Sequence, residues 1–328
     1  MRASRIGFVG AGAVATRHAR TLLGFDDVRV VAVADPAPER ARLLAAQTGA
    51  IAYDTWVPML ERERLDALYV CVPPFAHGAP ELAAIEAGLP FFVEKPLAID
   101  LDTAESIAER LVGTGLVTCA GYHWRWLDTF ERAQELLAGN PARLALCHWL
   151  DKAPPPAWWV RKDGSGGQTI EQTTHVLDLA RALVGEVTEV HAAGGRVDPA
   201  ALPGTDVDEV TAATLRFATG AVGTVSSTYL LKGLHRAGIQ LYAQGLALEL
   251  SETELVVEDG AGNRAVHPAK EDARPRPDRD FVDAVRGGPD RIRVPYQEAL
   301  RTHRLACAIT RSAEEGRTVP LAGDRAHA

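Results

Sequence analysis

The sequence predicts two domains: an α/β domain built on a doubly wound parallel sheet, then an α+β domain with a largely antiparallel open sheet. In the first ~120 residues, continuous apolar strands alternate with helical segments, the pattern of a parallel sheet covered on both faces. The second half instead runs several strand-like segments in succession without helices between them. A glycine-rich turn also joins the first strand to the first helix.

The elements of the first domain follow from apolar runs and from the turn residues between them. The first strand, IGFVG at 6–10, leads into a helix through Gly12. Further strands are expected at 28–35, 66–73, 91–96 and 116–122, and further helices at 38–49, 80–88 and near 102–112.

In the second domain, strands no longer alternate regularly with helices. Helices are expected around 127–138, at 166–183 and at 296–316, and a first strand at 143–150. Strand-like segments then fill much of 189–260, with a hairpin that turns at Gly220. The proline-rich stretches 153–157 and 273–278 indicate loops. The expected domains are 1–122 and 123–328.

Composition and charge narrow the range of partners. Of 328 residues, 47% are apolar and 24% are charged, as in an ordinary globular protein, and the net charge is −8. An acidic chain without a lysine- or arginine-rich block is not expected to bind nucleic acid or an anionic membrane. The chain enters an apolar strand soon after Met1, so we expect no signal peptide, and it has no apolar run of about 18 residues. We therefore expect a cytoplasmic location and no membrane partner.

The turn GAGAVA fits the G-x-G-x-x-G/A pattern of a Rossmann-type dinucleotide-binding domain. Gly10 permits the tight turn, Gly12 lets the backbone approach a pyrophosphate, and Ala15 keeps the helix close to the strand. Free N–H groups at the helix N-terminus, around Ala13 and Val14, would face the phosphates. The alternative is that the glycines only turn a strand into a helix.

Asp35 stands at the end of the second strand, where an acid accepts hydrogen bonds from the adenosine ribose diol. Its carboxylate would repel the 2′-phosphate of NADP, whereas the nearby Arg40 lies inside the next helix. The sequence therefore favours NAD over NADP as the cofactor and predicts tighter binding of NADH than of NADPH.

Two further strand tips, VCVPPFAHG and VEKPLA, carry candidate cofactor contacts at the carboxyl edge of the sheet, where open α/β sheets bind ligands. We expect the following residues of these tips to line the cofactor groove: Val72, Pro73, His77, Glu94 and Lys95. A lysine at a strand tip can also be only a solvated charge. His18, like His77, is expected to pack or to line the groove rather than to catalyse.

The segment GGQTIEQTTHVLDLARAL places Glu171, His175 and Asp178 at i, i+4 and i+7, which is one face of an α-helix. An apolar stripe beside this row would pack on the core. The row could be half of a metal site, a catalytic row or an ordinary polar face. A zinc site lacks a second histidine here, and the four scattered cysteines have no metal-binding spacing, so we expect no metal.

Nearly the whole chain resembles the glucose–fructose oxidoreductase / inositol dehydrogenase / rhizopine-catabolism (Gfo/Idh/MocA) family. The resemblance rests on IGFVGAGAVATRHART, VCVPPFAH, FVEKPLA, GYHWRW, SGGQTIEQTTHVLDL and EALRTHRLACAITRSAEEGRTVPL. It implies an NAD(H)-dependent oxidoreductase that transfers a hydride between the nicotinamide and a secondary alcohol or ketone of a sugar, cyclitol or glycoside.

The resemblance also implies catalytic roles. His175 would exchange the hydroxyl proton, Lys95 would stabilise the charge that develops on the same oxygen, and Glu171 would complete the site. Chemistry agrees, because alcohol oxidation needs a base near neutral pKa, and histidine supplies one most easily. Glu171 departs from the aspartate that is common in the family. With its longer side chain, Glu171 would contact either the substrate or only His175.

On the substrate side, the resemblance points to His123 and Arg125, which follow the strand that leads into the second domain. Trp158 and Trp159 can stack on the apolar face of a sugar, or serve in the core or a lid. Asp178 matches the family's second acid, and it can equally be structural, as a cap or as the partner of Arg181.

Other function classes remain open. These are a nucleotide-sugar ketoreductase, which the scarcity of basic residues disfavours, a glycosidase-like branch that holds NAD tightly, and a non-catalytic NAD(P)H-sensing protein. Retention of both Lys95 and His175 disfavours the sensor. The resemblance further implies a homodimer or homotetramer formed through the exposed face of the second sheet, and a small carbohydrate or cyclitol as substrate.

Overall fold

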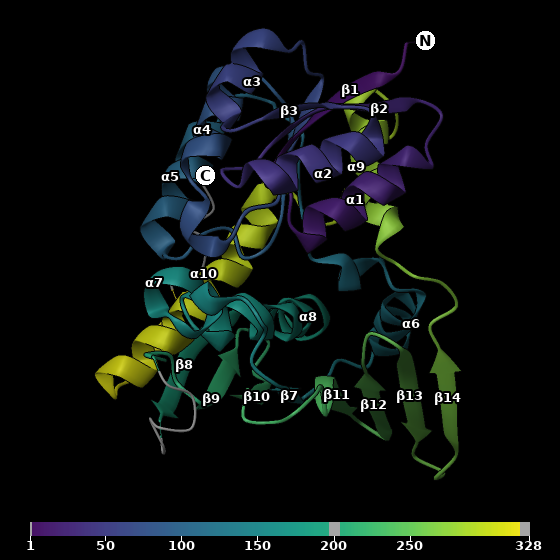
Figure 1. Cartoon of the computed structure of the whole chain (residues 1–328). Helices are drawn as coiled ribbons and strands as arrows, with labels where there is room; N and C mark the ends of the chain where they lie inside the picture. The colour runs from purple at the N-terminus through teal and green to yellow at the C-terminus, as the bar shows by residue number, and fades with distance from the viewer. Residues whose placement is uncertain (1, 197–203, 322–328) are drawn as a thin grey trace. The chain divides into compact units, whose positions relative to one another are not determined.

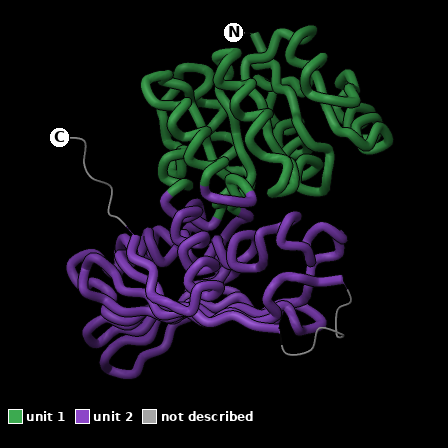
Figure 2. The backbone as a smooth tube through the Cα atoms, turned by 90° about the vertical axis from the view of Figure 1, so that its left-hand side faces the viewer, with its two compact units in different colours: residues 1–98, 102–123, 273–300 green, residues 99–101, 124–272, 301–328 purple. Residues whose placement is uncertain are grey.

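The computed structural model describes residues 2–196 and 204–321, which form two compact units (Figure 2). Unit 1 comprises residues 1–98, 102–123 and 273–300, and unit 2 comprises 99–101, 124–272 and 301–328. The boundary expected from the sequence, after residue 122, lies next to the end of the second stretch of unit 1. The units differ from that expectation in assigning 273–300 to unit 1. Residues 197–203, which include the end of one expected strand, lie outside the described residues.

Unit 1 is built on a six-stranded parallel sheet in the order β3-β2-β1-β4-β5-β6. Its strands are β1 Ser4–Val9, β2 Val28–Ala34, β3 Ile51–Tyr53, β4 Ala67–Val70, β5 Phe91–Val93 and β6 Thr118–Ala120. Every residue of β4 and β5 is buried, as expected for central strands covered on both faces. The predicted doubly wound sheet is confirmed. Its strand order reverses between β1 and β4, the place where such sheets bind ligands.

The helices of unit 1 pack on this sheet. They are α1 Ala13–Leu23, α2 Pro38–Thr48, α3 Trp56–Arg62, α4 Ala79–Glu86, α5 Leu101–Leu111 and α9 Pro275–Val285. Figure 1 shows α1, α2 and α9 to one side of the sheet and α4 and α5 to the other. Helix α9 corrects the expectation that 273–278 is a loop. Pro275 and Pro277 lie in its first turn, where a missing N–H leaves no helical hydrogen bond unmade.

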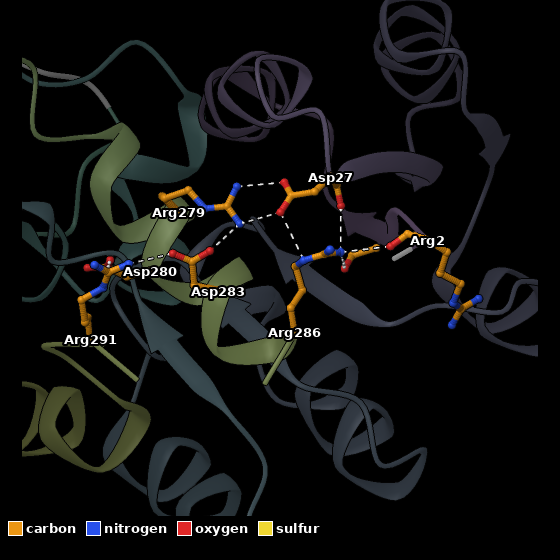
Figure 3. Close-up of polar contacts among 8 residues, drawn as sticks. Arg2, Asp27, Arg279, Asp280, Asp283, Arg286 and Arg291 are labelled. Carbon is orange, nitrogen blue, oxygen red and sulfur yellow. Dashed lines mark hydrogen bonds and ion pairs between the residues drawn. The ribbon is translucent and has the colours of Figure 1, made fainter. Parts of the chain in front are cut away.

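Ion pairs attach α9 to the start of β2 within unit 1 (Figure 3). Arg279 donates two hydrogen bonds to Asp27, at 2.9 and 3.1 Å, and Arg286 Nε lies 3.1 Å from the same carboxylate. The hydrogen bond from Arg279 lowers the pKa of Asp27. A segment from the last sixth of the chain therefore completes the first domain.

Unit 2 contains a nine-stranded sheet in the order β14-β13-β12-β11-β7-β10-β9-β8-β15. The strands are β7 Leu144–Leu150, β8 Val187–Gly195, β9 Val210–Phe217, β10 Val222–Thr228, β11 Arg236–Ala243, β12 Leu246–Leu250, β13 Glu254–Asp259, β14 Arg264–Pro268 and β15 Val319–Pro320. Neighbouring strands pair antiparallel except β7 and β10, which run parallel. The predicted, largely antiparallel sheet is confirmed, as is the β9–β10 hairpin with Gly220 in its turn.

The helices of unit 2 are α6 Asp128–Leu137, α7 Lys162–Ser165, α8 Thr174–Val184 and α10 Tyr296–Glu315, the last of which begins in unit 1. Figure 1 shows α6 and α8 over one face of the sheet. Buried and exposed residues alternate along β9 and β10, so the outward side chains of these strands are exposed. No helix within the described ranges is both long and apolar enough to cross a membrane.

Candidate functional site

The glycine turn after β1 has the geometry of a phosphate-binding loop. Gly10 has a φ of +94°, and a Cβ at this position would overlap the carbonyl oxygen of Cys71, so only glycine fits. A Cβ on Gly12, by contrast, would meet no atom within 4 Å. Ala13 and Val14 are exposed at the first turn of α1, where the N–H groups have no partner inside the helix. This open, donor-rich surface fits a pyrophosphate.

Asp35 ties the loop to the end of β2. Its Oδ2 accepts a hydrogen bond from Ala11 N at 2.8 Å, and its Oδ1 accepts one from Ala37 N at 2.8 Å. An ionised carboxylate offers about four acceptor positions, so two remain for the hydroxyls of a ribose. The loop and the acid that the sequence predicted for dinucleotide binding therefore lie at one edge of the sheet.

At the tip of β4, the His77 side chain is buried, so only the backbone of this residue is exposed. Val72 and Pro73 are half-buried. The His77 side chain is fully buried, with Nδ1 2.6 Å from Glu81 Oε1. The small exposed part of His77 therefore belongs to its backbone, which would make the contact expected with a cofactor.

The tip of β5 holds Glu94 and Lys95. Glu94 Oε2 accepts a hydrogen bond from the Lys95 backbone N at 3.1 Å, and Glu94 Oε1 lies 2.8 Å from His18 Nε2 and 3.2 Å from Arg17 Nη2. Burial alone would raise the pKa of Glu94, but its hydrogen bond with His18 and the positive charges around it lower that pKa to about 2. Glu94 is therefore ionised and anchored, and Lys95 follows it at the tip.

In unit 2, the acid–histidine–acid segment is not one regular α-helix, which corrects the expected stacking of three side chains on one face. Residues Thr169–Thr173 are π-helical and α8 begins at Thr174. A π-helical turn holds more residues than an α-helical one, and such turns occur frequently at functional sites. Glu171 lies in the π-helical part, whereas His175 and Asp178 lie in α8.

Trp159 binds Glu171. Its indole Nε1 donates a hydrogen bond to Glu171 Oε2 at 2.8 Å, and the ring is fully buried against Val207 and Tyr229. Trp159 thus belongs to the core of unit 2 and offers no indole face to a sugar. Trp158, the other candidate for stacking, is half-buried.

His175 lies among two indole rings. Its ring centroid is 5.9 Å from that of Trp124 and 5.7 Å from that of Trp149, with interplanar angles of 16° and 22°. His175 is only 7% exposed, so these near-parallel rings restrict the orientation of the imidazole. Trp149 was not identified from the sequence as a neighbour of His175. Trp149 lies two residues after the buried Cys147 on β7, so both side chains are on the same face of the strand.

Arg125 and Asp178 are bound to each other. Arg125 donates two hydrogen bonds to the Asp178 carboxylate, at 2.6 and 2.9 Å, and Thr302 donates a third at 2.9 Å. Both members of the pair are buried. Asp178 thus pairs mainly with Arg125, and the nearest nitrogen of Arg181 lies 4.0 Å away. Direct contact of Arg125, Asp178 or the half-buried His123 with a substrate stays a prediction.

The structure also bears on metal binding. Among residues 2–196 and 204–321, no three or more histidines, cysteines, aspartates or glutamates are grouped so that they could hold a metal ion.

A phosphate loop, a ribose-facing acid and a doubly wound sheet define a dinucleotide-binding α/β protein. The family model described as "Oxidoreductase family, NAD-binding Rossmann fold" matches residues 4–122, and the model described as "GFO/IDH/MocA C-terminal domain" matches residues 132–246. The chain therefore belongs to the Gfo/Idh/MocA family of NAD-binding oxidoreductases, as its sequence predicted.

Similar proteins extend over nearly the full chain. Myo-inositol 2-dehydrogenase of Thermotoga maritima is 28% identical over 333 residues, which cover 97% of this chain and 98% of that protein. The structure of levoglucosan dehydrogenase in complex with NADH and levoglucosan has a TM-score of 0.86 at 20% identity, covering 97% of this chain and 99% of that one. The WlbA dehydrogenase from Bordetella pertussis, in complex with NADH and UDP-GlcNAcA, has a TM-score of 0.85 at 22% identity, covering 98% and 100%. These structures have the same fold.

Proposed function

We propose that this protein is an NAD-dependent dehydrogenase that oxidises a secondary hydroxyl of a cyclitol or sugar, or reduces the corresponding ketone. The observation that carries this conclusion is a lysine fixed by an ionised glutamate on the sheet edge that also bears the phosphate loop. The near full-length similarity to a myo-inositol 2-dehydrogenase supports a polyhydroxylated ring as substrate.

The proposed mechanism divides the work between named residues. Bound NAD would supply the hydride acceptor, held by the loop at Gly10 and Gly12 and by Asp35. His175 would accept the hydroxyl proton, and Lys95 would donate a hydrogen bond to the same oxygen and stabilise its developing negative charge. Glu171, fixed by the Trp159 indole, would orient His175.

A substrate panel tests this assignment. Inositols, common monosaccharides, levoglucosan and a nucleotide-linked sugar are incubated separately with NAD and with NADP, and the absorbance of the reduced cofactor is followed. We expect turnover of a cyclitol or free sugar with NAD. We also expect NADH to bind at least about tenfold more tightly than NADPH, because Asp35 would repel a 2′-phosphate. An Asp35→Ser variant, which lacks the carboxylate, is expected to lose this preference.

The other function classes are outcomes of the same panel. Turnover of the nucleotide-linked sugar alone would indicate a nucleotide-sugar ketoreductase. Release of an aglycone from a glycoside without net formation of NADH would indicate the glycosidase-like branch. Cofactor binding without any turnover would indicate a sensing protein. Each of these results contradicts the proposed dehydrogenase.

We also propose that the chain forms a homodimer or homotetramer through the exposed face of the unit 2 sheet. Tyr242, Leu144 and Val222 lie in register across three adjacent strands, and each is at least 37% exposed. Such a row of apolar side chains supports burial against a second copy. We expect Val222→Glu to dissociate the oligomer in light scattering, whereas Leu43→Glu, on the exposed surface of α2, leaves it intact. A monomeric wild-type protein would contradict this.

We further propose a cytoplasmic location, with neither nucleic acid nor a membrane as partner. All four cysteines are free thiols, which supports a reducing compartment, and the net charge of −8 disfavours polyanionic partners. Recovery of the protein in the membrane fraction of lysed cells would contradict this.

A further inference from the structure

A buried cluster of charged groups lies within unit 1, around His18 of α1. We propose that His18 is a positioning residue for Lys95: as an imidazolium held between Glu94 and Asp278, it fixes the Glu94 carboxylate and thereby the backbone that carries Lys95. This inference rests on the proposed function, since it concerns the reaction in which Lys95 would act.

Both ring nitrogens of His18 face a carboxylate. Nδ1 lies 2.7 Å from Asp278 Oδ1, and Nε2 lies 2.8 Å from Glu94 Oε1. An ionised carboxylate only accepts hydrogen bonds, whereas a neutral imidazole has one donor nitrogen and one acceptor nitrogen. With both carboxylates ionised, the two contacts are satisfied together only when both nitrogens carry a proton. The geometry therefore selects the charged imidazolium, bound by two charge-assisted hydrogen bonds.

The surroundings of His18 exclude water. The residue is 2% exposed, and its ring lies 4.9 Å from the ring of Phe92 and 5.5 Å from that of Tyr69. Burial alone would lower the pKa of His18, but the charges and hydrogen bonds of Asp278 and Glu94 outweigh that effect and raise the pKa to about 9. His18 is therefore charged at neutral pH.

The titratable groups facing the cluster come from every element packed around it. They are Asp278 of α9, Glu94 and Lys95 after β5, Arg17 of α1, Tyr69 of β4, Cys71 after β4 and Cys119 of β6. Burial raises the pKa of Tyr69 and of both thiols well above their usual values, so these three are neutral. The positive charges beside the Glu94 carboxylate are those of His18, Arg17 and Lys95.

The cluster is coupled to Lys95 through Glu94. One oxygen of Glu94 binds His18 and Arg17, and the other accepts the hydrogen bond from the Lys95 backbone N. Gly121 packs against the Glu94 carboxyl group. A Cβ at this position would lie 2.6 Å from the carboxyl carbon and from both oxygens of Glu94. If His18 lost its charge, the Glu94 carboxylate would keep Arg17 and Lys95 as its positive neighbours. The Lys95 ammonium would then be drawn towards Glu94 and away from a substrate.

The same groups give stability a defined pH dependence. The pKa of His18 is 6.5 without its partners and about 9 in the fold, so its contribution is complete below pH 6.5 and is lost as the pH rises through 9. The pKa of Glu94 is 4.5 without its partners and about 2 in the fold, so its contribution is complete above pH 4.5 and is lost as the pH falls through 2. The cluster is expected to stabilise the fold most between these limits, at pH 4.5 to 6.5.

Asp278→Asn tests the inference without altering Glu94 or Lys95. The asparagine carbonyl still accepts from Nδ1, but the charge that favours the imidazolium is lost. We expect the decline of kcat on the alkaline side to begin about one pH unit lower than in the wild type, with KM and the Kd for NADH changed less than about threefold. Asp280→Asn, which removes the same charge from the same helix, is expected to leave the kcat profile unchanged. The substrate is the fastest of the panel above.

Two further measurements separate positioning from stability. The ¹⁵N NMR signals of the His18 ring are expected to show both nitrogens protonated at pH 8 in the wild type and one of them unprotonated in Asp278→Asn. His18→Gln is expected to lower kcat by about 10- to 100-fold throughout the pH range. A neutral His18 at pH 8, or coincident kcat profiles for Asp278→Asn and the wild type despite a shift in stability, would refute the inference.

Failure of the proposed function can be distinguished from failure of the positioning role of His18. If Lys95→Met kept full activity, or if the wild type turned over no panel substrate, the proposed function would fail, whereas the NMR result would still establish or reject the imidazolium. If Lys95→Met were inactive and the His18 and Asp278 variants matched the wild type, only the positioning role would fail.

Discussion

Lys95→Met is expected to lower kcat by about 10³-fold while the Kd for NADH changes less than about threefold. Methionine retains a flexible apolar stem but lacks the ammonium group, so the variant removes one hydrogen bond and one positive charge from the reacting oxygen. Removal of a single donor of this kind in a closed site typically lowers the rate by about 10²- to 10³-fold.

The measurement is steady-state kinetics with the best panel substrate, together with fluorescence titration of NADH. Lys270→Met, at an exposed position of unit 2, is the matched control and is expected to retain wild-type kcat. A Lys95→Met enzyme with wild-type kcat would contradict the catalytic assignment of the lysine. An equal loss in both variants would trace the effect to charge alone.

His175→Asn is expected to lower kcat for alcohol oxidation by about 10²- to 10⁴-fold and to flatten its dependence on pH. A base that accepts the hydroxyl proton must be neutral, so the wild-type rate is expected to rise as the pH passes through the range in which imidazoles lose their proton. Asparagine can still fill the space beside Trp124 and Trp149 but accepts no proton. The rise with pH should therefore disappear along with most of the rate.

The matched control is His267→Asn, which removes an exposed imidazole from β14. Its pH profile is expected to coincide with that of the wild type. If His175→Asn lowered kcat but retained the wild-type rise with pH, another group would be the base and His175 would only shape the site.

Elements defined by local signals were predictable from the sequence. The strands of unit 1 form from short apolar runs, and the loop at Gly10 follows from a backbone conformation that only glycine adopts readily. Asp35 was predictable because the end of the second strand and the phosphate loop meet at the same sheet edge in this fold. These features depend on residues close in sequence or on a fixed topology.

Features that depend on distant contacts were not predictable. Pro275 and Pro277 indicate a loop, but prolines fit the first turn of a helix equally well, and the distant packing of Phe281 on Tyr69 distinguishes the two. His18 and Asp278 are 260 positions apart in the sequence, so the residues next to His18 give no indication that it is charged. The π-helical turn likewise has no signal in the letters TIEQT, and its Glu171 binds the indole of Trp159 from another segment.

Helix α9 has a consequence for how the protein is made. Its Phe281 packs edge-on against Tyr69 and Phe92, and its Asp278 supplies one of the two partners of His18. A growing chain that has emerged from the ribosome only as far as residue 122 carries all six strands of the first sheet without this cover. The aromatic face of that sheet then stays uncovered while strands β7 to β14 of the second sheet are synthesised. The domain that begins first is thus finished late, after α9 has emerged.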